Sequence, residues 1–99
     1  MAFEIVKLGT DNYTEVLADA NKSYNVSPNF AVRTKATREI LADIHFQDGP
    51  VKEKGINGVA NEDLIVMVML RLNQFQKSDY ACKENADAVR HLQGALDSL

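Results

Sequence analysis

The chain has 99 residues, of which 45% are hydrophobic and 25% are charged, and its formal net charge is −3. This length and composition predict one globular domain, 1–99, since natural domains cluster near ~100–150 residues. Lysine and arginine are scattered along an acidic chain, which disfavours long nucleic acid as a partner because phosphate contacts dominate such binding. A small phosphorylated ligand stays open as a partner, because a few well-placed cations suffice to hold it.

Cysteine usage and hydropathy indicate the compartment. Cys82 is the only cysteine, so an intrachain disulfide is impossible and a reducing compartment is expected. Residues 1–4 lack the basic and then apolar pattern of a signal peptide. No apolar run approaches the ~18–20 residues that a membrane helix needs. The sequence therefore predicts a soluble cytosolic protein that does not enter a membrane.

The first thirty residues predict one strand and one helix. Phe3–Leu8 is rich in β-formers and is closed by Gly9, which indicates an edge strand. Thr10-Asp11 then supplies an N-cap, and residues at helical spacing predict an amphipathic helix of about three turns. Those residues are Tyr13, Val16, Leu17, Ala20 and Tyr24. Ser27-Pro28 ends the helix, because proline cannot continue it.

The middle of the chain favours a β-hairpin. Ile40–Gln47 alternates apolar and polar residues with period two, so it is expected to pair with Phe30–Thr34. A helix from Thr34 to His45 is the competing interpretation. Gln47–Ala60 follows as one extended loop, functional or simply connecting, whose glycines are expected to adopt positive φ. These glycines are Gly49, Gly55 and Gly58.

Residues 61–99 predict two helices folded back on each other. Asn61 is expected to cap the first helix, and Ser78 or Asp79 the second, across the polar break Gln76-Lys77-Ser78-Asp79. The apolar stripe of the first helix is Leu64, Val68, Leu72 and Phe75, with Ile65 and Met69 alongside. The stripe of the second is Ala81, Asn85, Ala88, Leu92, Ala95 or Leu96, and Leu99. No helix stop precedes Leu99, so the sequence is expected to end within a helix.

These elements predict an α+β fold: a small antiparallel β-sheet near the N-terminus, followed by a long antiparallel helical hairpin. The β-containing part with one short helix occupies residues 1–60, and the hairpin occupies 61–99. A hairpin of this length cannot bury both of its apolar faces alone, so the chain is expected to form a homo-oligomer with sites between subunits.

Enzyme-like motifs are sparse, and no metal or cofactor is expected. His45 and His91 stand alone, Cys82 has no second cysteine at metal-ligand spacing, and the glycines fit no phosphate-binding loop. A hydrolase using Cys82 and His91 is conceivable, yet nine residues separate them, about 13 Å along a helix. The alternative is a small hydrophobic Cys82 and a solvated His91.

Four residues are candidates for binding a ligand. Phe75 is either a core residue or a platform on which a base stacks. Asn85 on an apolar stripe either fixes helix register or uses its amide, both donor and acceptor, to read a base or ribose edge. Arg71 and Lys52 are either solvated surface residues or cations that neutralise phosphates.

The stretch from Phe46 to Leu99 resembles the phage Thoeris anti-defence sponges, which share a helical-hairpin domain with anti-CBASS sponges. The residues that carry the resemblance form an ordered set at characteristic spacings. They are Phe46-Gln47-x-Gly49-Pro50, Glu53-x-Gly55-x-Asn57-Gly58, Asn61-Glu62-x-Leu64, Arg71-Leu72-x-x-Phe75-Gln76, Ala81-Cys82-x-Glu84-Asn85-Ala86, Leu92 and Ala95-Leu96.

The resemblance implies a non-enzymatic phage protein in the cytoplasm of the infected bacterium. Such proteins bind cyclic ADP-ribose isomers or cyclic di- and trinucleotides and keep these signals from their effectors, at sites between subunits of a dimer or hexamer. Phe75 would then stack on a base and Asn85 would hydrogen-bond the ligand. The family usually continues with an arginine-rich stretch ending in Arg-Gly-Val-Glu-Gly, which this sequence lacks after Leu99. A structural or interaction protein that uses the hairpin only as an interface is the alternative.

Overall fold

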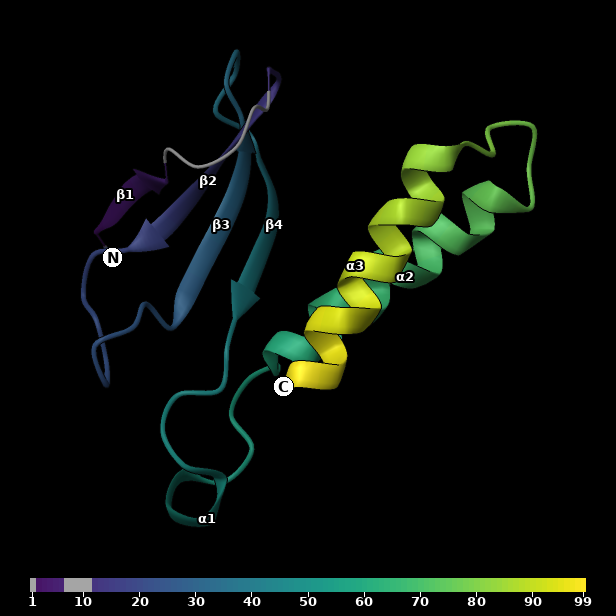
Figure 1. Cartoon of the computed structure of the whole chain (residues 1–99). Helices are drawn as coiled ribbons and strands as arrows, with labels where there is room; N and C mark the ends of the chain where they lie inside the picture. Colours follow the sequence, from purple (N-terminus) through teal and green to yellow (C-terminus); the bar gives the residue numbers. More distant parts are fainter. Residues whose placement is uncertain (1, 7–11) are drawn as a thin grey trace. The chain divides into compact units, whose positions relative to one another are not determined.

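The computed structural model describes residues 2–6 and 12–99. It shows an α+β arrangement in which a four-stranded antiparallel sheet precedes the helices (Figure 1), so the predicted fold class is confirmed. The chain forms two compact units, Met1–Val59 with the sheet and Ala60–Leu99 with the helical hairpin. The expectation of a single domain over 1–99 stays a prediction.

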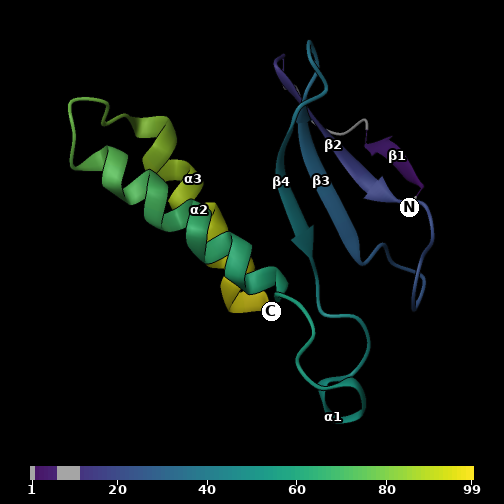
Figure 2. The same ribbon diagram turned by 180° about the vertical axis from the view of Figure 1, so that it is seen from behind.

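The sheet is an antiparallel meander with strand order β1-β2-β3-β4, seen from both sides in Figure 1 and Figure 2. Its strands are β1 (Phe3–Val6), β2 (Thr14–Asp19), β3 (Asn29–Thr34) and β4 (Ile40–His45). The predicted edge strand is confirmed over Phe3–Val6, because β1 lies at one end of the strand order and, within the described residues, pairs only with β2. Leu8 and Gly9, at the end of that prediction, lie outside the described residues.

The predicted helix that ends at Ser27-Pro28 is wrong, because Thr14–Asp19 forms β2. Leu17 and Ala18 are buried there, and β2 pairs with β1 on one side and with β3 on the other. A helix of about three turns is marginal alone, so pairing on two sides overrides a helical spacing of apolar residues. Tyr13 and Tyr24 of the predicted stripe are 82% and 62% exposed. The predicted N-cap, Thr10-Asp11, lies outside the described residues.

The predicted β-hairpin is confirmed, and the competing helix from Thr34 to His45 is wrong. β3 and β4 pair antiparallel, with one register shift between Val32 and Arg33. Phe30 of β3 packs edge-on against Phe46, the residue that follows β4, with ring centroids 5.5 Å apart. Alternation of apolar residues along β4 was therefore a valid strand signal.

A row of polar side chains crosses the sheet. Asp19, which is 4% exposed, accepts a hydrogen bond from the Asn29 amide at 3.0 Å and from the Asn21 backbone N–H at 2.9 Å. Asn29 Oδ1 in turn contacts His45 Nδ1. These bonds hold the pKa of Asp19 below its ordinary value, with the Asn29 amide the largest cause. His45 is exposed, as an outward-facing strand residue should be.

The segment after the sheet is more ordered than the extended loop predicted. It contains the short helix α1 (Val51–Lys54), the only helix that the structure describes before residue 60. Gly49 and Gly55 have φ of +83° and +69°, as expected, but Gly58 does not have a positive φ. Gly58 instead allows close approach, because a Cβ there would lie 2.5 Å from the Phe46 carbonyl oxygen.

The hairpin consists of α2 (Asn61–Gln76) and α3 (Lys83–Ser98). Both predicted caps are wrong: Ala60 and Cys82 are the N-cap residues, in place of Asn61 and of Ser78 or Asp79. At the first cap, the Asp63 carboxylate accepts a hydrogen bond from the Ala60 N–H at 2.8 Å. The linker between the helices therefore spans residues 77–82, and Ala81 lies outside α3.

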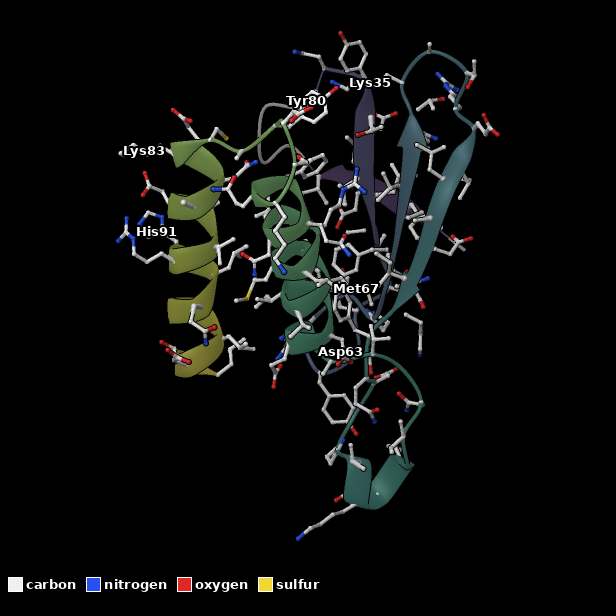
Figure 3. All side chains as sticks on the ribbon, turned by 90° about the vertical axis from the view of Figure 1, so that its right-hand side faces the viewer. Lys35, Asp63, Met67, Tyr80, Lys83 and His91 are labelled. Atoms are coloured by element: carbon white, nitrogen blue, oxygen red, sulfur yellow. The ribbon has the colours of Figure 1, made fainter. Side chains whose placement is uncertain are left out.

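The helices pack through half-buried residues, and neither helix contains a fully buried one. In α2 these residues are Leu64, Ile65, Met69, Leu72, Phe75 and Gln76. In α3 they are Asn85, Asp87, Ala88, Val89, Leu92 and Leu96. Other apolar residues of α2 stay in solvent, and Val66, Met67 and Leu70 are 50%, 58% and 58% exposed. In Figure 3, Met67 lies on the side of α2 opposite α3. Across the described residues, no helix has the length and apolar character needed to cross a membrane.

Candidate functional site

A pocket of about 380 Å³ lies at the end of the hairpin where α2 meets the linker. We call it the turn pocket, and its lining residues are Arg71, Gln74, Phe75, Ser78 and Tyr80. The α2 residues come together because positions three and four apart share one face of a helix. The pocket therefore combines one cation, two aromatic rings and two neutral polar side chains.

Arg71 and Phe75 are in direct contact within this pocket. The Arg71 Cζ lies 5.2 Å from the centroid of the Phe75 ring, which is a cation–π arrangement between residues i and i+4. Arg71 makes no ion pair among those formed by residues 2–6 and 12–99. Its charge is therefore available to an anion, while its guanidinium plane is already held beside the ring.

The cations of α3 differ from Arg71. Lys83 and Arg90 bind the Asp87 carboxylate at 2.7 and 3.3 Å. These bonds, with Lys83 the larger cause, hold the pKa of Asp87 below its ordinary value. The two cations of α3 thus share one carboxylate, and Arg71 is the cation among the described residues that line the turn pocket.

The linker is braced by side chains. The Gln76 carboxamide donates to the Cys82 carbonyl and accepts from the Cys82 N–H, both at 2.9 Å. The Ser78 hydroxyl donates to the Phe75 carbonyl at 2.6 Å and accepts from the Tyr80 N–H at 3.1 Å. The polar break predicted here therefore folds into a defined turn that contains Tyr80.

The other two predicted site residues are not in the turn pocket. Asn85 is half-buried in α3, and its carboxamide forms no hydrogen bond within the described part of the chain. Lys52 is exposed in α1, which belongs to the sheet unit. Of the four predicted residues, the structure therefore brings together Phe75 and Arg71. The roles of Asn85 and Lys52 stay predictions.

Sequence reasoning missed Gln74, Ser78 and Tyr80. The sequence does contain a signal for Tyr80, because a large aromatic residue within a short polar linker has no core to pack into. In the structure its side chain is 76% exposed. Gln74 could have been found from its spacing, because it lies three residues after Arg71 on α2.

A second pocket, of about 350 Å³, lies in the sheet unit. It is lined by Phe3, Asn29, Phe30, Asp43, Ile44 and His45. Its described lining residues include a carboxylate and no lysine or arginine, so they suit a phosphorylated ligand less well than those of the turn pocket do.

Cys82 and His91 lie nine positions apart along the chain, at the start and in the body of α3. Cys82 is exposed at the N-cap of α3. His91 lies on the side of α3 that faces away from α2 (Figure 3). Among residues 2–6 and 12–99, no three His, Cys, Asp or Glu side chains gather in a way that could hold a metal ion.

Comparison with known proteins places the hairpin among phage sequences. The profile of the family described as "Acb2/Tad1, hairpin domain" matches residues 38–96. A protein named "Thoeris anti-defense 1", from Bacillus phage SBSphiJ7, is 57% identical over 56 residues. The matched region covers 57% of this chain and 39% of that relative, so the chain matches about two fifths of the relative's length.

Proposed function

The chain belongs to the Acb2/Tad1 hairpin-domain family, and from this premise we propose that it is a phage anti-defence protein. It binds a cyclic nucleotide-type signal, a cyclic ADP-ribose isomer or a cyclic di- or trinucleotide, in the cytoplasm of the infected bacterium. By sequestering this signal, it blocks Thoeris or CBASS immunity without catalysis.

The observation that carries this proposal is the pairing of Arg71 and Phe75 in the turn pocket. A ring and a cation without an ion pair suit a ligand that carries both a base and phosphates. An aromatic–base stack contributes ~1–3 kcal/mol. Hydrogen bonds to a charged group contribute ~1.5–3 kcal/mol.

Asn85 supplies the polar recognition in this proposal. Its carboxamide is half-buried and is not hydrogen-bonded within the described residues, so both of its donor and acceptor groups are available. Lys52 is the second cation that assists with the phosphates. Because Asn85 and Lys52 do not line the turn pocket, we propose that the complete site forms between subunits.

The exposed face of α2 supports assembly into a homo-oligomer, a dimer or a hexamer. We call it the outer face and define it by Val66, Met67 and Leu70, which are half or more exposed. Met67 and Leu70 lie one helical turn before Arg71 and Gln74 of the turn pocket. A second copy that covers the outer face would therefore border the pocket as well.

The groups of the turn pocket support sequestration without turnover. The turn pocket offers a guanidinium, two amide or hydroxyl side chains and two aromatic rings. A guanidinium stays protonated at neutral pH and cannot act as a general base. These groups bind and orient a ligand, and the ligand should be recovered intact.

The test is isothermal titration of the chain with cyclic ADP-ribose isomers and cyclic di- and trinucleotides. We expect saturable binding of one class, which Phe75→Ala abolishes. Phe3→Ala, a partly exposed phenylalanine of β1, is the matched control and should bind normally. A folded, assembled Phe75→Ala protein with unchanged affinity would contradict the site.

The alternative is an interaction protein in which the hairpin is only an interface, and the outer face of α2 is the observation that favours it. Phe75 would then stabilise packing, and Phe75→Ala would cost up to ~3–5 kcal/mol of unfolding free energy and disrupt assembly. Under the binding proposal, the same variant keeps its oligomeric state and loses its ligand.

A further inference from the structure

We propose that Tyr80 is a second ligand-contacting aromatic residue of the turn pocket, which packs against a planar ring of the bound ligand. This inference rests on the proposed function, and it adds a residue and a selectivity that the function alone does not supply. The starting observation is an exposed aromatic side chain that contributes little to the packing of the fold.

Tyr80 makes little contribution to the packing of the hairpin. It is 76% exposed, and its hydroxyl has no hydrogen-bond partner within the part of the chain that the structure describes. Large aromatic side chains bury 150–250 Å² when they reach a partner, so an exposed one leaves much of that surface in water. A ligand ring in the turn pocket would cover this surface.

The position of Tyr80 is fixed relative to Phe75 by Ser78. The Ser78 hydroxyl donates to the Phe75 carbonyl at 2.6 Å and accepts from the Tyr80 N–H at 3.1 Å. The Gln76 amide holds Cys82 on the other side of the linker through two bonds of 2.9 Å. Because the linker is already ordered, a ligand need not organise it, and less conformational entropy is lost on binding.

The contact between Arg71 and Phe75 gives Tyr80 a distinct role. The guanidinium already lies 5.2 Å from the Phe75 centroid, so part of that ring's surface is occupied by a cation. Tyr80 has no such neighbour among the ring contacts of the described residues. A base that stacks near Phe75 therefore meets a second ring from the linker side.

A second aromatic contact implies selectivity for ligands that carry a base. Ribose 5-phosphate offers the same sugar and phosphate chemistry but has no ring to stack. The geometry thus predicts that removing the Tyr80 ring weakens the binding of cyclic nucleotides. The weak binding of ribose 5-phosphate should stay unchanged.

The experiment compares Tyr80→Ala and Tyr80→Phe with the wild-type chain, using cyclic ADP-ribose, cyclic di-AMP and ribose 5-phosphate as probes in isothermal titration. For the tighter cyclic probe we expect Tyr80→Ala to weaken binding about 5- to 150-fold, the range of a single stack. Tyr80→Phe should bind within a few-fold of wild type. Tyr13→Ala, an exposed tyrosine of the sheet unit, is the matched control.

Tyrosine fluorescence gives an independent readout, because the chain has three tyrosines and no tryptophan. We expect a saturating cyclic nucleotide to quench emission in wild type, and the quenching to disappear in Tyr80→Phe while binding persists. A tyrosine that merely supports the linker would not show this pattern.

The outcomes separate this inference from the proposed function. If Tyr80→Ala binds like wild type while Phe75→Ala does not bind, Tyr80 is not a contact and the proposed function stands. An equal loss in Tyr80→Phe would contradict a ring contact. A wild-type chain that binds neither cyclic probe nor any other of the panel overturns the proposed function and this inference together.

Discussion

The guanidinium of Arg71 lies over the ring of Phe75, with its Cζ 5.2 Å from the ring centroid. The two residues are one turn apart on α2, so the helix itself sets their spacing. The contact orients a charge without neutralising it, because an aromatic ring carries no countercharge. This arrangement is the basis for the first prediction.

Replacing Arg71 tests whether ligand binding needs its planar guanidinium group or only its positive charge. We expect Arg71→Lys to weaken ligand binding about 10-fold or more, and Arg71→Gln to weaken it further, because lysine loses the planar fork and glutamine also loses the charge. Titration calorimetry at two salt concentrations measures both effects. Arg90→Gln on α3 removes a cation from outside the pocket and serves as the control. Equal affinities for all three variants would exclude Arg71 from the site.

Removing the Gln76 side chain should loosen the linker. Gln76→Ala loses two hydrogen bonds to the Cys82 backbone, and we expect a loss of about 1–2 kcal/mol in unfolding free energy. Faster amide exchange at residues 77–82 should accompany it. Gln93→Ala, whose amide binds Asp97 on the surface of α3, is the matched control. Unchanged amide exchange in the linker would show that Gln76 does not hold it in place.

Asp19 should make the sheet unit sensitive to acid. Hydrogen bonds from the Asn29 amide and the Asn21 N–H lower its folded-state pKa below the ordinary 3.8. A depressed pKa means that the ionised form stabilises the fold above that ordinary value, and that this stability is lost as the pH falls through the folded pKa. Urea unfolding from about pH 6 down to about pH 2 measures it. Asp19→Asn should be less stable at neutral pH and should show a smaller acid-induced change. A parallel pH dependence in both proteins would contradict this role.

The outer face of α2 should mediate assembly. We expect Leu70→Glu to shift the oligomer toward monomer, because a carboxylate would enter an apolar interface, while monomer stability changes little at a 58% exposed position. Sedimentation velocity measures the change. His91→Glu places the same charge on the exposed side of α3 and should leave assembly intact. An unchanged oligomer in Leu70→Glu would place the interface elsewhere.

Several elements were predictable because local pattern and tertiary environment agree in them. The alternation along Ile40–His45 matched a strand with one exposed edge, and the 3.6-residue spacing along α2 matched a helix packed on one side. The hairpin also contains residues at the spacings typical of the family, so its family could be recognised from the sequence. Phe75 and Arg71 were predicted separately, as a possible base platform and a possible phosphate cation, and the structure shows that they share one face of α2.

Other elements depended on partners that a single segment does not reveal. Thr14–Asp19 has apolar residues at helical spacing, and only its pairing with β1 and β3 makes it a strand. Cys82, the N-cap of α3, is held by the Gln76 carboxamide, a contact that the preference of Ser78 and Asp79 for N-cap positions does not reveal. Tyr80 was missed because its place in the turn pocket comes from the same linker geometry.

The central claim is that this chain holds a cyclic nucleotide-type signal without consuming it. Native mass spectrometry of the chain with the full panel of cyclic ADP-ribose isomers and cyclic di- and trinucleotides tests it most directly. The proposal predicts an oligomer that gains the intact mass of one ligand class, and release of that ligand unchanged on denaturation. An oligomer that gains no ligand mass, or that releases a cleaved product, would contradict it.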